Sequence, residues 1–225
     1  MNKNIVLEAK GITKYFNDPV KFEVLKQVNF SINKGEFVSV VGKSGCGKST
    51  LLYILSTMDT DYSGDLLIDG ISMKDKSEKE LAAVRNEKIG FVFQFHYLLN
   101  EFTVLHNVIL PALKLNRLQQ PVLEEKGIKL LSLLGIEKLS GKMANQLSGG
   151  EKQRVAIARA MINDPLIIMG DEPTGNLDSK NSQIVFDIFK ELAVEFNQTL
   201  LIVTHDDAFA EKTNRIIKMD DGRVV

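Results

Sequence analysis

The stretch GKSGCGKST, Gly42 to Thr50, decides the fold of this chain. It follows the apolar run Phe37 to Val41 and precedes the apolar run Leu51 to Leu55. A continuous apolar run bounded by glycine is typical of a buried strand, and the run behind the motif is predicted to be helical. A strand, a glycine-rich loop and the start of a helix form the context of a phosphate-binding loop. The alternative, an ordinary glycine-rich turn with a surface lysine, is disfavoured because every motif position is filled and both flanks are correct.

The residue types in this loop suit the binding of a nucleoside triphosphate. Glycines allow a close backbone approach that a Cβ would block, and the amides at a helix N-terminus attract an anion. Lys48 is predicted to reach the β- and γ-phosphates, and the Ser49 hydroxyl to ligate Mg²⁺. The predicted nucleotide-binding residues of the loop are Gly42, Lys43, Ser44, Gly45, Cys46, Gly47, Lys48, Ser49 and Thr50. For Cys46 the alternative is that any small residue serves at its position.

The composition indicates a globular protein that works in a reducing compartment. The chain has 225 residues, enough for one large α/β domain or a domain with a subdomain. A formal net charge of -1 gives no electrostatic reason to expect nucleic-acid binding. The single cysteine excludes an internal disulfide. No apolar run is long enough to span a bilayer, and the stretch from Met1 to Asn4 does not open a signal peptide, so we expect a cytosolic location.

Strand and helix patterns alternate along most of the chain. Such alternation predicts an α/β fold with a mainly parallel sheet that is covered on both faces. Between Phe95 and Gln146 the pattern is helical, with periodic faces over residues 104–115 and 122–134 that are separated near Pro121. We therefore expect one domain, with residues 1–94 and 148–225 forming the α/β core and residues 95–147 an inserted helical subdomain. A turn is predicted at Asn17-Asp18-Pro19.

Two acidic residues follow the buried strand predicted at Leu166 to Met169. Ligand sites of open α/β sheets lie at the carboxyl ends of the strands, so Asp171 and Glu172 should face the phosphates. Adjacent strand residues point to opposite faces, which suits different tasks: Asp171 to hold Mg²⁺ and Glu172 to polarise the attacking water. The alternative is a solvated turn before Pro173.

The sequence LSGGE, Leu147 to Glu151, precedes a predicted helix that runs to Ile162. Ser148 and Glu151 match a capping box, which explains them without a ligand. A cap does not require Gly149 and Gly150, and bare amides at a helix N-terminus suit a second phosphate-binding surface. Both interpretations are compatible.

These motifs, taken in order, resemble the ATP-binding cassette (ABC) ATPase family over essentially the whole chain. GKSGCGKST resembles Walker A, LSGGE the family signature and LIIMGDE, Leu166 to Glu172, Walker B. Three single residues resemble further family positions: Gln94 the Q-loop glutamine, Asp178 the D-loop aspartate and His205 the switch histidine. The resemblance implies a P-loop NTPase fold of the ABC type, with an N-terminal antiparallel β subdomain and an inserted helical subdomain.

The resemblance also implies how the protein works with ATP and Mg²⁺. Two copies would pair head to tail, with ATP between the Walker A loop of one and the signature turn of the other. Ser148, Gly149, Gly150 and Glu151 would then meet the γ-phosphate of the partner's ATP. His205 and Lys48 would act with Glu172 in hydrolysis, and Gln94 would contact Mg²⁺ and sense a membrane partner. Phe16, with Tyr15 as the second choice, would stack on adenine.

Single positions keep simpler alternatives. Phe16 could be an ordinary core or hairpin aromatic. His205 and Asp178 could be helix-cap residues, and Gln94 any polar residue at a strand end.

Three classes within the family compete. They are the ATPase subunit of a membrane transport system, a soluble ATPase of repair or translation, and a regulatory module without hydrolysis. The distance from Gln94 to Ser148 leaves no room for the coiled coil of repair types, and Glu172 and His205 are intact. We therefore expect a homodimeric ATPase subunit on the cytoplasmic face of the inner membrane, which docks onto separately encoded integral membrane subunits and does not bind nucleic acid.

The stretch from Phe93 to Thr103, FQFHYLLNEFT, narrows the class. It resembles bacterial lipoprotein-releasing ATPases of the LolD type, with MacB-type efflux and FtsE-type division ATPases as alternatives. Its apolar residues would help to form the groove that receives a membrane-subunit helix, and core packing is the alternative for them. They are Phe95, Tyr97, Leu98 and Leu99.

Overall fold

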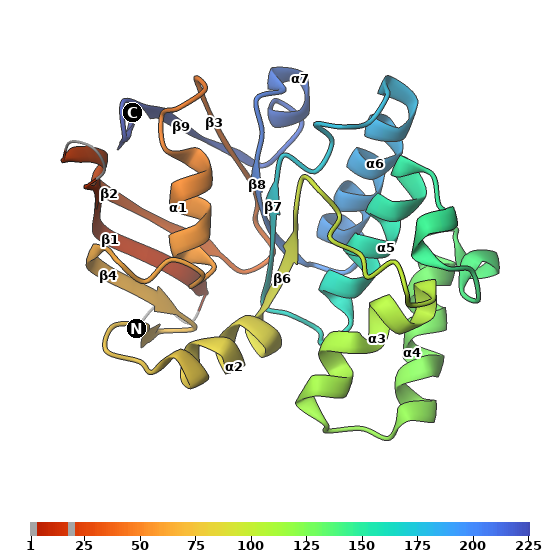
Figure 1. Ribbon diagram of the computed structural model, residues 1–225. Coiled ribbons are helices and arrows are strands. Elements are labelled where there is room, and N and C mark those ends of the chain that lie inside the picture. Colours follow the sequence, from red (N-terminus) through yellow and green to blue (C-terminus); the bar gives the residue numbers. More distant parts are fainter. Residues whose placement is uncertain (1–3, 18–20) are drawn as a thin grey trace.

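The central sheet of the computed structural model, which describes residues 4–17 and 21–225, has six strands. Their order is β10-β9-β3-β8-β7-β6, and all neighbours pair in parallel except β10 and β9. The central strand β3 leads into the phosphate-binding loop (Figure 1). The strands are β3 (Phe37–Gly42), β6 (Ile89–Val92), β7 (Ile167–Asp171), β8 (Thr199–Val203), β9 (Arg215–Asp220) and β10 (Arg223–Val224).

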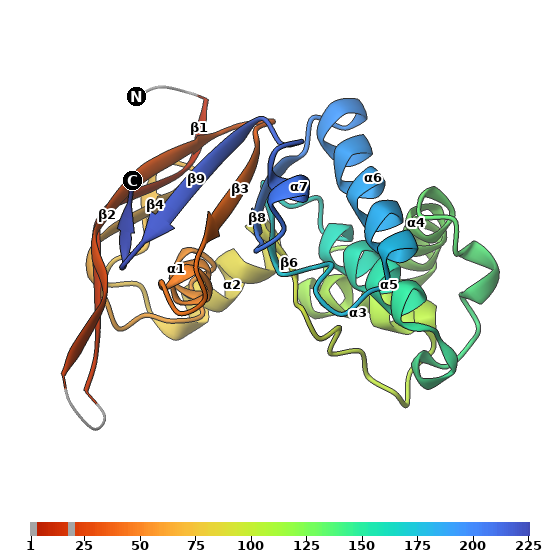
Figure 2. The same ribbon diagram turned by 90° about the horizontal axis from the view of Figure 1, so that it is seen from above.

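A second, antiparallel sheet has the strand order β2-β1-β4-β5. Its strands are β1 (Ile5–Phe16), β2 (Phe22–Asn33), β4 (Ser63–Ile68) and β5 (Ile71–Ser72). The helix α1 (Lys48–Leu55) lies between the two sheets, as both views show (Figures 1 and 2). The turn predicted at Asn17-Asp18-Pro19 falls largely outside the described residues.

The remaining helices lie mostly on the far face of the central sheet (Figure 2). Near the sheet, α5 packs on β6 and α6 packs on β8, and α3 and α4 pack on α5. These helices are α2 (Glu78–Lys88), α3 (Val104–Leu115), α4 (Gln120–Leu133), α5 (Gly149–Met161), α6 (Ser179–Glu195) and α7 (Asp207–Ala210), with short 3₁₀ turns at Glu137–Leu139 and Ala144–Gln146.

Two hydrophobic cores form because strand residues alternate between the faces of the central sheet. Met169 in β7 and Val203 in β8 face the core shared with α1 and the antiparallel sheet. Their neighbours Ile168 and Ile202 face the core shared with the helices. The continuous apolar runs of the sequence thus reflect strands that are buried on both faces.

The predicted α/β class is confirmed, including the antiparallel sheet and the mainly parallel core. Pro121 lies near the break between the two helices, as predicted, although α4 starts at Gln120, two residues earlier than expected. It occupies the first turn of α4, where its missing N–H and fixed φ are tolerated. Phe196 caps α6 and is 54% exposed.

Candidate nucleotide site

The carboxyl ends of β3, β8, β7 and β6 meet along one edge of the central sheet. Parallel pairing places Val40 opposite Val203, and Asp171 opposite the same valine on its other side. Val92, at the end of β6, lies opposite Gly170. This register brings together the loop after β3, His205 after β8, the acidic pair after β7 and Gln94 after β6.

The phosphate-binding loop ends in a helix whose first amides have no side-chain cap. The cap residue Gly47 has a φ of 99°, and a Cβ there would lie 2.9 Å from the carbonyl oxygen of Val24. Only glycine therefore closes the loop against β2 without strain. The buried Lys48 ammonium bridges the loop, donating to the carbonyl oxygens of Gly42 at 2.8 Å and Lys43 at 3.0 Å. Free amides and a lysine at one helix N-terminus form an anion site.

Two oxygen ligands suitable for Mg²⁺ lie side by side next to this loop. The Ser49 hydroxyl donates to a carboxylate oxygen of Asp171 at 3.0 Å. Burial raises the pKa of Asp171, the Ser49 hydrogen bond opposes the rise, and the neighbouring Glu172 adds to it. A bound divalent cation would reverse this balance in favour of the carboxylate. Hydroxyl and carboxylate oxygens are ligands that Mg²⁺ prefers, so these residues fit the ion.

Glu172 and His205 form a second pair at the same edge. Nδ1 of His205 lies 2.8 Å from Oε2 of Glu172, and the His205 amide lies 3.3 Å from the same oxygen. The Glu172 side chain is 15% exposed, whereas that of His205 is 70% exposed. Glu172 has a φ of 47°, an unfavourable conformation for a residue with a Cβ, so the surrounding structure must impose it. The Glu172 carboxylate is thus held in place beside an exposed imidazole.

Gln94 lies beside the turn that follows β7 and contains Gly175 and Asn176. Its side-chain nitrogen would be 3.1 Å from a Cβ built on Gly175, and its carbonyl oxygen accepts from Asn176 at 3.3 Å. The segment after β6 and the turn after β7 are therefore in contact.

The signature turn is capped as the sequence predicts. The amide of Glu151 lies 3.4 Å from the Ser148 hydroxyl, and the Glu151 carboxylate accepts from both the amide and the hydroxyl of Ser148 at 2.7 Å. These bonds lower the pKa of Glu151. Within the described residues, Ser148, Gly149 and Gly150 share no hydrogen bond with the phosphate-binding loop of the same chain.

Gly150 packs closely against the start of α6. A Cβ there would lie 2.2 Å from Oδ1 of Asn181. Asn181 is held by Asp178, which accepts from its amide at 2.8 Å and from its side chain at 2.7 Å. The signature turn and the D-loop aspartate are therefore joined through Asn181, a residue that the sequence reasoning did not single out.

The two candidate adenine-stacking aromatics are both exposed. Phe16 is 46% exposed and has the Lys14 ammonium 5.5 Å from its ring centre. Tyr15 is 37% exposed and donates its hydroxyl to Glu23 at 3.0 Å. Phe16 is therefore not a core residue, whereas the hairpin alternative agrees with its pairing to Phe22 across β1 and β2.

Tyr53 also belongs to the site and was missed. It lies one helical turn after Ser49 on α1, and burial and the Asp171 carboxylate raise its pKa. The i, i+4 spacing from Ser49 was the signal that could have identified it.

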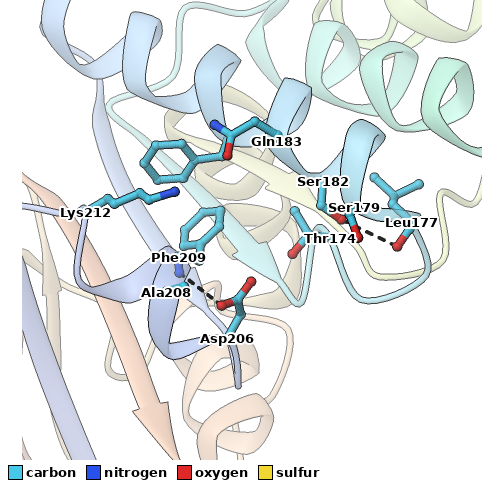
Figure 3. A pocket seen from close by; sticks show the side chains of 10 residues that line it. Thr174, Leu177, Ser179, Ser182, Gln183, Asp206, Ala208, Phe209 and Lys212 are labelled. Carbon is cyan, nitrogen blue, oxygen red and sulfur yellow. Dashed lines mark hydrogen bonds between the residues drawn. The ribbon is translucent and has the colours of Figure 1, made fainter.

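A cleft of about 580 Å³ extends beside the phosphate-binding loop. It joins Gly42, Lys43 and Ser44 to His205 and Asp207. A separate pocket of about 270 Å³ lies between the start of α6 and α7, where Asp206 caps α7 and the Lys212 ammonium lies over Phe186 (Figure 3). This second pocket contains none of the predicted phosphate ligands.

Fold and site together define a P-loop nucleoside triphosphatase. Residues 25–175 match the sequence profile of the family described as ABC transporter. The Aquifex aeolicus (strain VF5) protein named "Lipoprotein-releasing system ATP-binding protein LolD" is 48% identical, over 98% of this chain and 96% of the relative. A protein of the same name from Bacteroides fragilis (strain YCH46) is 46% identical, over 98% of this chain and 100% of the relative.

Solved structures agree with this assignment. The "Dimeric Structure of MJ0796, a Bacterial ABC Transporter Cassette" superposes with a TM-score of 0.89 at 40% identity, over 97% of this chain and 96% of that one. A second structure of that cassette, "bound to ADP and Pi" in a "post-hydrolysis state", has the same scores and coverage. The chain belongs to the ABC transporter family, and it is an ATPase subunit of that family.

Proposed function

We propose that this protein hydrolyses ATP with Mg²⁺ to drive lipoprotein release by a bacterial ABC transport system. The single observation that carries the chemistry is the alignment of Ser49 with Asp171, and of Glu172 with His205, at the strand ends beside the phosphate-binding loop. Phosphoryl transfer depends on positioning and charge neutralisation, which these groups supply.

Each group in this arrangement has a distinct task. Lys48 and the loop amides bind the β- and γ-phosphates, and Phe16 stacks on the base. Ser49, Asp171 and Gln94 hold Mg²⁺, which neutralises phosphate charge when it is bound. Glu172 orients the attacking water and accepts its proton. His205 is a neighbour of Glu172 and contacts the γ-phosphate.

Two copies of the chain complete each other's sites. The amides of Ser148, Gly149 and Gly150 lie at the start of α5, away from the loop of their own chain, so they are available to the nucleotide of a partner. Asp178 holds the adjoining D-loop. The dimeric state of the MJ0796 cassette supports this pairing.

The membrane partner is engaged by the inserted helical subdomain, residues 95–147. Phe95, Tyr97 and Leu99 are 60%, 66% and 39% exposed, whereas Leu98 packs into the helical core. Three exposed apolar side chains within five residues suit a docking surface for a helix. No helix of the described residues has the length and apolarity to cross a bilayer. We propose that the protein works on the cytoplasmic face of the inner membrane, bound to integral membrane subunits. The names of the relatives support lipoprotein release over the MacB-type and FtsE-type alternatives.

Purification of the tagged chain from solubilised membranes tests this function. We expect integral membrane subunits to co-purify and to stimulate ATP hydrolysis, and the reconstituted complex to release a lipid-anchored protein from vesicles in the presence of ATP. Recovery of soluble protein alone, or of bound nucleic acid, would contradict the membrane function. Stimulation by membrane subunits without release of a lipid-anchored protein would favour efflux or division.

A further inference from the structure

Arg159, near the end of α5, holds the backbone of the segment that follows Gln94. Its Nη2 donates to the carbonyl oxygen of His96 at 2.7 Å, and its Nη1 donates to that of Tyr97 at 2.8 Å. Burial lowers the pKa of Arg159. Among the described residues it forms no ion pair with a carboxylate, unlike Arg85, Arg117 and Arg215. Arg159 is half-buried, and a partly desolvated guanidinium without a counter-ion is costly, so its hydrogen bonds to the two carbonyls compensate.

The held segment has an unfavourable backbone. Tyr97 has a φ of 46°, outside the usual range for a residue with a large side chain. Such a conformation persists where the surroundings over-determine it, and the fork of Arg159 binds the carbonyl of this residue. The segment is thus fixed in a shape that exposes the Phe95 and Tyr97 rings.

A second attachment connects the same segment to the phosphate-binding helix. The Tyr97 ring meets Phe93 edge-on at 5.1 Å between ring centres, and Phe93 packs on Phe91 at 4.3 Å. Phe91 lies 6.3 Å from Tyr53 on α1. The aromatic series therefore ends one turn from Ser49.

The helix α5, to which Arg159 attaches the segment, is itself packed closely on β6. Gly90 in β6 faces the carbonyl of Ala160, where a Cβ would lie 2.4 Å from the oxygen, so α5 and β6 are in close contact beside Arg159. From Arg159 the helix runs about three turns back to Ser148. In the proposed dimer, α1 serves the ATP of its own chain and the start of α5 serves the ATP of the partner. Residues 95–97 are joined to α5 through Arg159 and, through the aromatic series, to α1.

We propose that Arg159 is a positioning residue that couples the docking segment, residues 95–97, to the signature helix α5, so that engagement of a membrane subunit is transmitted to the partner's ATP. This inference rests on the proposed function. Arg159 touches neither nucleotide nor metal ligands, so its loss should leave ATP binding intact and remove the response to the membrane subunits. Coupling free energies of this kind correspond to about 5- to 150-fold effects.

The test compares Arg159→Met with Arg159→Lys. Lysine keeps the positive charge but lacks the two guanidinium nitrogens that donate to the two carbonyl oxygens. Asn163→Ala is the matched control, because the Asn163 side chain donates to the carbonyl of Asn86 at 2.8 Å and so anchors the same end of α5 to α2 instead. ATP turnover is measured for the isolated subunit and for the complex with its membrane subunits. We expect isolated turnover and ATP affinity within about twofold of the parent in all variants. The stimulation of ATP turnover by the membrane subunits should fall by about 5- to 150-fold in Arg159→Met and by less in Arg159→Lys. In Asn163→Ala the stimulation should persist.

Equal stimulation of Arg159→Met and the parent would overturn the inference, as would an equal loss in Asn163→Ala. Parallel losses of isolated turnover, stimulation and melting temperature would show a purely structural role. Hydrogen exchange of the isolated Glu172→Gln subunit gives an independent reading. Adding ATP should change exchange at residues 95–99, and the added Arg159→Met substitution should abolish that change. If the parent binds no membrane subunit, the proposed function fails, while hydrogen exchange still decides the role of Arg159.

Discussion

At the scale of single residues, the site places two adjacent carboxylates in different surroundings. Asp171 is buried and bound to Ser49, whereas Glu172 is held in a left-handed backbone conformation beside the exposed His205. Neighbouring acids can therefore have separate tasks, one toward a cation and one toward water.

Glu172→Gln should lower ATP hydrolysis by about 10²–10⁴-fold, because the amide cannot accept the proton of the attacking water. ATP affinity should stay close to that of the parent, since Glu172 binds no phosphate. Steady-state phosphate release and equilibrium ATP binding measure the two effects, with the exposed Glu195→Gln as the control. Near-normal turnover of Glu172→Gln would remove Glu172 from its proposed role.

Asp171→Asn should stabilise the nucleotide-free protein at pH 7. Burial raises the pKa of Asp171, so the folded state binds this proton more tightly than the unfolded state. The carboxyl costs no stability below the unfolded pKa. The loss of stability caused by the Asp171 carboxylate grows as the pH rises from the pKa of Asp171 in the unfolded chain to its pKa in the folded protein. Above both values the loss is complete. Urea unfolding should show a gain at pH 7 that shrinks toward pH 4.

The comparison variant is Asp178→Asn, which should lower the stability of the folded protein at pH 7 instead of raising it. Hydrogen bonds from the amide and side chain of Asn181 lower the pKa of Asp178, so its charge favours folding at neutral pH. A loss of stability in Asp171→Asn that does not depend on pH would show that the hydrogen bond to Ser49 outweighs the cost of burial.

At the scale of elements, two helices begin with nearly identical capping boxes. In α5, Ser148 pairs with Glu151, and in α2, Ser77 pairs with Glu80, with hydroxyl-to-carboxylate distances of 2.7 and 2.6 Å. The α5 turn alone contains two glycines after the cap. The same local chemistry therefore occurs once with and once without a proposed ligand.

Ser148→Asp separates capping from phosphate binding. Aspartate is as good an N-cap as serine, so the helix should persist, while its charge should repel the γ-phosphate across the dimer. We expect ATP turnover and ATP-driven pairing to fall by at least about tenfold. Ser77→Asp introduces the same change beside Glu80 and should leave both unchanged. Equal behaviour of the two variants in turnover assays would contradict the role of Ser148 in a partner's site.

At the scale of the whole molecule, each chain of the proposed dimer would supply half of two nucleotide sites. The phosphate-binding loop lies at the edge of the central sheet and the signature turn at the start of α5, with no hydrogen bond between them in the described residues. In the proposed dimer, a second copy would bring them together.

Glu172→Gln should sediment as a dimer with ATP and as a monomer with ADP, because the γ-phosphate bridges the two chains. Analytical ultracentrifugation measures this. Adding Ser148→Asp to the same background should return the protein to the monomer. A dimer that forms equally with ATP and ADP would show an association that does not depend on the γ-phosphate.

How far the sequence predicts this structure depends on the range of the interactions. The bounds of α3 and the strand before the phosphate-binding loop follow from local periodicity. The four-residue helix α7 does not, because Phe209 is buried against Phe37 and Phe186 from distant parts of the chain. The bonds of Arg159 likewise join residues more than sixty positions apart. Motif residues were predictable, and the residues that connect them were not.

The pairing of β6 with β7 has a practical consequence for hybrid proteins. The chain leaves the central sheet at Val92 and returns at Ile167 on the neighbouring strand. Everything between these points could be exchanged with the corresponding stretch of a related ATPase through two joints that lie side by side. Such a graft would carry Gln94, the apolar docking residues, Arg159 and the signature helix together, and would leave the recipient's proposed metal ligands Ser49 and Asp171 in place. The preference for one set of membrane subunits could then be transferred from one ATPase to another with this stretch of chain.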